Sequence, residues 1–343
     1  MKLMRVHPAI RAFTLFAAAG FAAAASAPDV CAQPNPSADQ LNQLMNHRRE
    51  MSTRAVEETK TRRFEEGKSD TIFPSDMMTA RKGGVVRVLT REEQKAIQHN
   101  ARGLDLFSKG KLDAAMKEYQ EAIRSDAKLA EAHNNLGTAY FAAGRFEEAA
   151  AAFRRACELD ADYGQAFFNL GLAHIRLGRE KEANEILDAA LRAYASAGAA
   201  HFSAGRFKEA EDAFRGMLQI DQEYIPALLR LGLVYNALSR YEDAAQNIRR
   251  VIGRQPNNAL AHEILAEALY GGKNYEGAVA AADRALKLSP DSSEAHYLAG
   301  LARASLGQRD DALAHLARLE QLKSTDLAQQ LSDFINKKQP AKP

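Results

Sequence analysis

The sequence predicts an all-α solenoid, a stack of paired helices, and three observations lead to this. A set of apolar and small residues recurs with a period of about 34 residues, which is enough for two short helices and their turns. Within each recurrence the apolar positions lie three or four residues apart, as on one face of an amphipathic helix. Hydrophobic residues make up 46% of the 343-residue chain, so every layer of the stack has apolar surface to bury.

The most complete recurrence runs from 130 to 163. Leu136 and Tyr140 lie one turn apart in its first expected helix, and Phe153 marks the inner face of the second. Gly137 stands where a side chain would hold the two helices apart, and Gly144 belongs to the turn between them. This stretch therefore predicts two antiparallel helices in close contact.

Seven such recurrences follow one another. Their expected bounds are 96–129, 130–163, 164–190, 191–224, 225–258, 259–292 and 293–326. The third is seven residues short, close to two helical turns, so its second helix can continue into the next first helix without rotating its apolar face. Because the stretch from Arg179 to Ala197 contains neither Gly nor Pro, we expect one long helix there. A tight turn near Tyr194 with two shortened helices is the alternative.

The motif itself resembles a known repeat. His133-x2-Leu136-Gly137-x2-Tyr140, followed by Ala149-x3-Phe153 and Ala161, is similar to the 34-residue tetratricopeptide pattern, with His in the Trp slot and Ala161 in the Pro slot. The resemblance covers about two thirds of the chain. It implies a superhelix whose concave side, lined by the first helices, binds an extended peptide or a partner helix, but it does not identify the partner.

Candidate binding residues follow from carrying the family's groove positions over to this chain. An asparagine amide both donates and accepts hydrogen bonds, so Asn135 and Asn169, at equivalent positions, are candidates for holding a partner's main chain. Aromatic and leucine side chains around them would receive apolar groups. Packing against the neighbouring repeat is the alternative for each of them. The candidates are Asn100, Asn134, Asn135, Phe141, Phe168, Asn169, Leu172, Phe202, Leu229, Arg230 and Leu233.

The family's lysine and asparagine clamp for the terminal carboxylate of chaperone tails has no match here. The positions of its first lysine are occupied by Asn100, Asn134, Phe168, Ala195 and Leu229. The resemblance therefore does not imply a cochaperone for such tails.

The segment 1–32 has the pattern of a secretory signal peptide. Three basic residues precede an apolar, Ala-rich run from Ala12 to Ala25, which is shorter than the ~20 residues that span a bilayer. Cleavage after Ala27 would leave Pro28 at the next position, whereas cleavage after Ala32 avoids this. We expect an exported protein, periplasmic or secreted and at most peripheral to the membrane. An uncleaved anchor or a lipid-modified Cys31 is the alternative.

Residues 33–95 form a polar arm outside the repeats. Lys68 to Gly84 has the composition of a linker, and Val85 to Leu89 is a short apolar run expected to lie against the first repeat. Thr90-x-x-Glu93 predicts a capping box at the start of the first repeat helix. An arm that docks on a partner and a mobile tether are both compatible with this composition.

Residues 327–343 are expected to form a capping helix and a tail. A terminal repeat would otherwise expose its apolar edge. The residues that share one face of this helix are Leu327, Leu331, Phe334 and Ile335.

Several function classes are disfavoured. The net charge is +2 with basic and acidic residues interleaved, which disfavours nucleic-acid binding. None of the nucleotide-binding, hydrolase or metalloprotease motifs occurs, so we expect no enzyme and no cofactor. Cys157 lies in a repeat helix, where packing is favoured over catalysis. Packing is also favoured over metal binding for the histidines of the Trp slot, which are His99, His133, His262 and His296.

The sequence thus predicts a non-catalytic scaffold that binds a protein or peptide in its groove. The alternative is a periplasmic assembly or chaperone factor for pili, secretion or outer-membrane components. A cell-wall or carbohydrate factor is weaker, because the groove positions include few aromatic residues.

Overall fold

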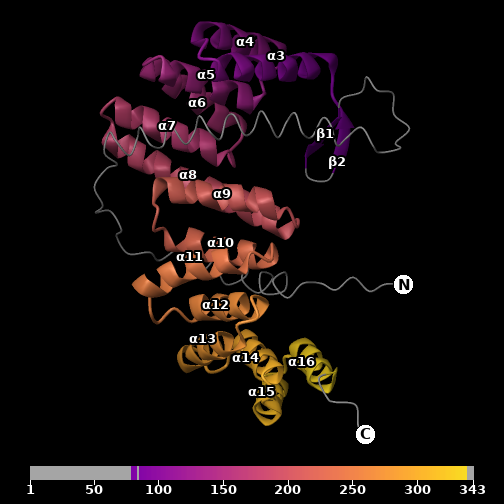
Figure 1. Ribbon diagram of the computed structural model, residues 1–343. Helices are drawn as coiled ribbons and strands as arrows, with labels where there is room; N and C mark the ends of the chain where they lie inside the picture. The colour runs from indigo at the N-terminus through magenta and orange to yellow at the C-terminus, as the bar shows by residue number, and fades with distance from the viewer. Residues whose placement is uncertain (1–78, 83–84, 338–343) are drawn as a thin grey trace. The chain divides into compact units, whose positions relative to one another are not determined.

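The computed structural model describes residues 79–82 and 85–337, and the structural statements below concern these residues. They form helices and one two-stranded hairpin (Figure 1). The chain divides into two compact units at Ser196. We call the described residues up to Ser196 the first unit and those from Ala197 the second unit, and each is described by itself. The expected signal peptide and most of the polar arm lie outside the described residues.

The hairpin opens the first unit. Strand β1 (Thr79–Lys82) pairs antiparallel with β2 (Val85–Val88), with Thr79 opposite Val88 and Lys82 opposite Val85. The prediction of a linker is therefore wrong for 79–82. The two residues between the strands are Gly83 and Gly84, a pair favoured in two-residue hairpin turns because glycine accepts a positive φ.

Paired helices make up the rest of the first unit. The capping box is confirmed, since the Glu93 amide donates to Thr90 Oγ1 at 3.2 Å and the Thr90 amide donates to Glu93 Oε2 at 2.8 Å. The turn at Gly144 is also confirmed, with a φ of 75° that suits glycine. The helices are α3 (Arg91–Ser108), α4 (Leu112–Ser125), α5 (Ala130–Ala142), α6 (Phe146–Leu159), α7 (Gly164–Arg176) and the beginning of α8 (Glu180–Ser203).

The second unit continues the same pattern from the end of α8. Consecutive helices pack against one another in hairpins (Figure 1). The helices are α9 (Phe207–Ile220), α10 (Ile225–Ala237), α11 (Tyr241–Arg254), α12 (Ala259–Gly271), α13 (Tyr275–Leu288), α14 (Ser293–Ser305), α15 (Arg309–Gln321) and α16 (Thr325–Lys337).

Helix α8 confirms the prediction of one long helix at the shortened recurrence. It has 24 residues, whereas α7 has 13 and α9 has 14. Its second half takes the place of a first helix, because Gly198 lies against Phe214 of α9 in the same way that Gly137 lies against Phe153. Even so, neither α8 nor any other helix in the described ranges is long and apolar enough to cross a membrane.

Close approach of the two helices depends on glycine in five of the repeats. A Cβ added at Gly137 would lie 2.7 Å from the ring of Phe153, which is fully buried. The same contact recurs at the same sequence separation in other repeats. The other pairs are Gly103 with Tyr119, Gly171 with Leu187, Gly198 with Phe214 and Gly232 with Ile248.

Helix α16 closes the second unit, as expected of a capping helix. Leu331 is fully buried and Ile335 is 2% exposed, in one apolar cluster with Tyr297 and Leu301 of α14. Without α16 the apolar edge of the last repeat would be exposed to water.

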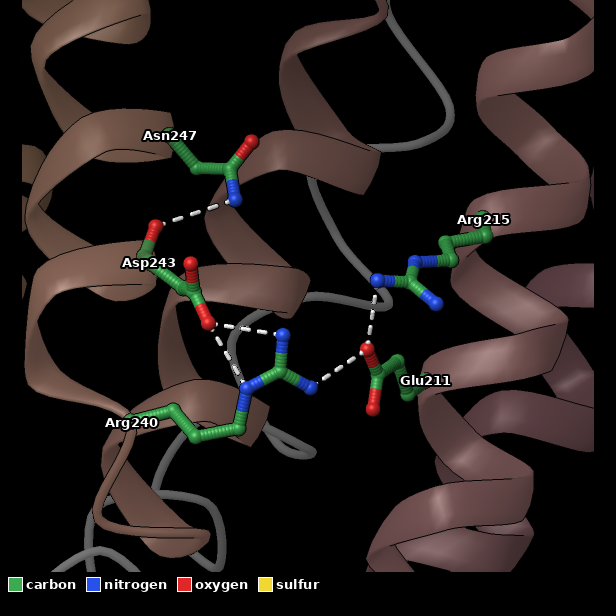
Figure 2. Close-up of polar contacts among 5 residues, drawn as sticks. All are labelled: Glu211, Arg215, Arg240, Asp243 and Asn247. Atoms are coloured by element: carbon green, nitrogen blue, oxygen red, sulfur yellow. Dashed lines mark hydrogen bonds and ion pairs between the residues drawn. The ribbon is translucent and has the colours of Figure 1, made fainter.

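A buried carboxylate links two successive repeats of the second unit (Figure 2). Glu211 of α9 is 6% exposed and accepts hydrogen bonds at 2.8 Å from Arg215 and Arg240. Arg240 also pairs with Asp243 at 2.7 Å, and the Asn247 amide donates to the Asp243 carbonyl oxygen at 3.1 Å. Since Arg240 precedes α11, this network fixes the start of that helix against α9.

Candidate functional site

Within each unit, the first helices of neighbouring repeats lie next to one another. Helix α5 contacts both α3 and α7 in the first unit, and α12 contacts both α10 and α14 in the second. The second helix of a repeat instead packs mainly on the first helix of the next repeat, as α11 packs on α12. Because the first helices are closer together, they line the inner side of each unit. The candidate binding residues all lie on these helices.

The structure divides the candidates by exposure. Four are partly exposed and have surface to offer a partner: Asn100, Asn135, Leu229 and Arg230. The others are buried and pack inside the repeats: Asn134, Phe141, Phe168, Asn169, Leu172, Phe202 and Leu233. Binding of a partner by these candidate residues stays a prediction. It depends mainly on the four partly exposed residues.

The asparagines join neighbouring first helices. Asn135 Nδ2 donates to Asn100 Oδ1 at 3.0 Å, and Asn169 Nδ2 donates to Asn134 Oδ1 at 2.7 Å. Asn169 Oδ1 accepts in turn from Gln165 at 2.9 Å. Both ends of the Asn169 amide are thus bonded within the first unit, so its side chain fixes α7 against α5.

Asn169→Ala is expected to lower the free energy of unfolding of the first unit by about 1–2 kcal/mol. The substitution leaves Asn134 Oδ1 and Gln165 Nε2 without these partners, and unmade buried hydrogen bonds carry a cost of this size. Urea unfolding followed by circular dichroism measures it. Gln246→Ala, at an exposed position of α11, is the control and should change stability by less than about 0.5 kcal/mol. Equal effects of the two substitutions would contradict the assigned role of Asn169.

Buried phenylalanines close the hairpins. Phe141 at the end of α5 meets Phe146 at the start of α6 edge to face, with ring centroids 5.2 Å apart. Phe202 and Phe207 repeat this arrangement at 5.3 Å. The Arg176 guanidinium lies 4.9 Å from the centroid of Phe146 and adds a cation–π contact. These contacts give Phe141 and Phe202 a packing role.

Arg230 is the one basic residue among the candidates. Its guanidinium lies 5.6 Å from the ring centroid of Phe214, and burial lowers its pKa. It forms no ion pair with a carboxylate in the described ranges. Together with partly exposed Leu229, it gives the inner side of α10 a mixed apolar and cationic surface.

Two carboxylates on α12 also occupy groove positions carried over from the family. Glu263 and Glu267 lie one turn apart and are partly exposed. Burial raises the pKa of both, to about 7 for Glu267. The sequence alone already sets Glu267 apart, because the equivalent positions in the preceding and following repeats are Leu233 and Leu301.

Family models match these repeats. One described as TPR repeat matches residues 103–144 and 137–178, one described as tetratricopeptide repeat matches 229–293 and 272–326, and another of that description matches 165–197. Together they cover more than half of the chain. The chain belongs to the tetratricopeptide repeat family. The expected fold class and family are thereby confirmed.

Solved structures of tetratricopeptide proteins are similar to this chain. A repeat protein from Parabacteroides merdae ATCC 43184 is 16% identical, with 71% of this chain and 99% of that one covered and a TM-score of 0.38. The second TPR of Spaghetti (RPAP3), bound to HSP90 peptide SRMEEVD, is 32% identical over 29% of this chain and 94% of that one, with a TM-score of 0.29. YrrB, a TPR protein with an unusual peptide-binding site, is 19% identical over 59% and 91%, with a TM-score of 0.28. A search of curated proteins found no match.

The histidines of the tetratricopeptide Trp slot hold the loops between repeats. His133, His262 and His296 each donate from Nε2 to the carbonyl oxygen six residues earlier, at 3.0 to 3.1 Å. A carbonyl can only accept, so Nε2 carries the proton in all three. His99 instead contacts Glu118 at 2.8 Å. No group of three potential metal ligands occurs in the described residues.

Cys157 packs inside its tetratricopeptide repeat. It is 8% exposed, and burial raises the pKa of its thiol to about 12. A thiol with so high a pKa is protonated at neutral pH and is a poor nucleophile. The geometry agrees with the packing role expected from the sequence.

A groove of about 700 Å³ lies on the second-helix side of the first unit. Its walls come from α4 and α6, and its floor comes from α5. The small side chains of Ala151 and Ala152 leave this space open. The other lining residues are Gln120, Ile123, Arg124, His133, Leu136, Tyr140, Glu148 and Arg155.

Proposed function

We propose that this protein is a non-catalytic scaffold that binds a segment of a partner protein along the inner side of its first helices. The observation that carries the proposal is the adjacency of first helices within each unit, with partly exposed Asn100, Asn135, Leu229 and Arg230 on them. Adjacent helices offer a continuous surface several repeats long. Such a surface suits an extended peptide or a helix.

The site of action is proposed to be the cell envelope. The support is the signal-like pattern of the segment 1–32, with basic residues before an apolar run. This pattern also favours the second candidate function, an envelope assembly or chaperone factor for pili, secretion or outer-membrane components. A scaffold would bind one fixed partner, whereas a chaperone would bind many unfolded clients.

Site-specific photo-crosslinking tests the proposal. A photoreactive amino acid at Leu229, on the inner side of α10, is expected to capture a partner in intact cells. The same amino acid at Gln246, exposed on α11, is the matched control and should capture much less. Equal capture at both positions would contradict binding on the inner side.

The pattern of captured proteins separates the two candidates. One dominant crosslinked species, lost in an Asn135→Ala/Arg230→Ala variant, supports a scaffold with a fixed partner. A broad set of species that the variant only weakens supports the chaperone. Fractionation of the cells, with the intact and the processed chain compared by mass, tests export.

A further inference from the structure

The inner side of the second unit has two carboxylates at positions where the neighbouring first helices have uncharged residues. Helices α10, α12 and α14 lie next to one another, and residues one repeat apart occupy equivalent positions on them. Two positions on α12 are glutamates, whereas the equivalent positions on α10 and α14 are uncharged. The two rows are Leu229, Glu263 and Tyr297, and Leu233, Glu267 and Leu301.

The carboxylates receive hydrogen bonds but no counter-charge. Ser292 Oγ donates to Glu263 Oε1 at 2.6 Å, and Asn236 Nδ2 donates to Glu267 Oε2 at 2.9 Å. No lysine or arginine within the described ranges forms an ion pair with either carboxylate. Partly buried carboxylates without a cation are unfavourable, since burial removes water that would otherwise stabilise the charge.

The neighbouring cation does not compensate for this. The guanidinium of Arg230 on α10 lies over the ring of Phe214 and forms no ion pair with either glutamate. Glu294 is the charged group that acts on Glu263, and it has the same sign. Neither glutamate on α12 is therefore neutralised by an ion pair with a basic residue among the described residues.

Asn236 gives an independent indication of the missing group. Its side chain is fully buried on α10, and its Nδ2 is held by Glu267 and by the Ile264 carbonyl oxygen at 3.2 Å. Its Oδ1 has no hydrogen-bond partner among the described residues. The buried Oδ1 of Asn236 and the carboxylates of Glu263 and Glu267 are all hydrogen-bond acceptors. This cluster therefore lacks hydrogen-bond donors.

We propose that Glu263, Glu267 and Asn236, here called the acidic inner site, receive a lysine or arginine side chain from the partner segment. This inference rests on the proposed function and specifies its partner. A cationic N–H donor supplies both the charge and the hydrogen bonds that the site lacks. Because α10 and α14 present uncharged residues at the equivalent positions, the partner carries its basic residue between uncharged ones.

A library of random linear peptides selected on the full chain tests this. Selected peptides are expected to contain one Lys or Arg flanked by apolar residues, and their binding should be lost in Leu229→Asp. Glu263→Gln/Glu267→Gln is expected to weaken the best peptide about tenfold or more, measured by fluorescence polarisation. Glutamine keeps the shape and one acceptor oxygen at each position, which is enough for the hydrogen bonds from Ser292 and Asn236.

A charge-matched variant and an altered peptide complete the design. Glu242→Gln/Glu276→Gln removes two exposed carboxylates from α11 and α13 and should change affinity less than twofold. Replacing the basic residue of the peptide with glutamine should weaken binding to the wild type about tenfold but hardly affect binding to the Glu263→Gln/Glu267→Gln variant.

The outcomes separate this inference from the proposed function. Peptides that depend on Leu229 but lack a basic residue, or that bind the glutamine variant equally well, would overturn the acidic inner site and leave the scaffold intact. A selection that yields no Leu229-dependent peptide would count against both.

Discussion

Replacing Phe153 with alanine is expected to lower the free energy of unfolding of the first unit by about 3–5 kcal/mol. The Phe153 side chain is completely buried, and its ring lies directly against Gly137 of the facing helix. Alanine leaves a cavity that α5 and α6 fill only partly, because their contacts with α4 and α7 hold them apart.

The facing glycine offers a reciprocal test of the same contact. Gly137→Ala places a Cβ 2.7 Å from the Phe153 ring, so it should cost about 1–3 kcal/mol through overpacking. In the Phe153→Ala background the space is empty, and the added methyl group should then cost little or even stabilise. Strict additivity of the two substitutions would contradict direct contact between them.

Urea unfolding of the full chain, followed by circular dichroism, measures the total effect. Repeat proteins can unfold one region at a time, so hydrogen exchange read by mass spectrometry should locate the loss. The largest loss of protection is expected in α5 and α6. Leu313→Ala, at an exposed apolar position of α15, is the control and should leave these helices unchanged.

The helix pairs could be predicted from the sequence because their signals are local. The pair of Gly137 and Phe153 recurs with the same spacing in other repeats, and several turns inside repeats contain a glycine with a positive φ, such as Gly144. The long helix α8 was predictable for the same reason, since a deletion of seven residues preserves the helical phase. The contacts between paired helices can therefore be predicted from the spacing of residues along each helix.

The hairpin of β1 and β2 was missed because its signal was assigned to a linker. Gly83 and Gly84 indicate irregular structure in general, but between two short runs they also favour a two-residue turn. The runs are only four residues each, and one contains both Arg81 and Lys82. Neither has the length or the alternation that identifies a strand by itself.

The binding residues were harder to predict because exposure depends on the neighbouring repeat. The helical phase places Asn135 and Asn169 at equivalent positions, and each amide donates to an asparagine of the preceding first helix. It does not show that Asn169 is covered by α5 while Asn135 stays partly open. For the same reason the sequence does not show that the pKa of Glu263 and Glu267 is raised, since the shift of a carboxyl pKa comes from surroundings that only the fold assembles.

Replacing Glu267 with glutamine is expected to stabilise the second unit by about 2 kcal/mol at pH 8 and to have almost no effect at pH 4.5. Burial, partly offset by the hydrogen bond from Asn236, raises the pKa of Glu267 from 4.5 to about 7. Each unit of pKa difference between the folded and unfolded states corresponds to about 1.4 kcal/mol, and the partial exposure of the side chain reduces the total.

The direction follows from which state binds the proton more tightly. Below pH 4.5 the glutamate is protonated in both states, so its contribution to stability is fully present. As the pH rises toward 7, the unfolded chain releases the proton while the folded chain keeps it, and this contribution is lost. Glutamine has no proton to release and keeps the acceptor for Asn236.

The measurement is the difference in unfolding free energy between wild type and Glu267→Gln at several pH values. Other groups, such as Glu223, whose pKa is lowered by Arg250, contribute equally to both proteins and cancel. Glu276→Gln, exposed on α13, is the control and should change the free energy of unfolding by less than about 0.5 kcal/mol. A difference that is constant from pH 4.5 to 8 would refute the raised pKa. A difference that grows over this range would show that the fold keeps Glu267 at a cost in stability, which a bound cation can offset.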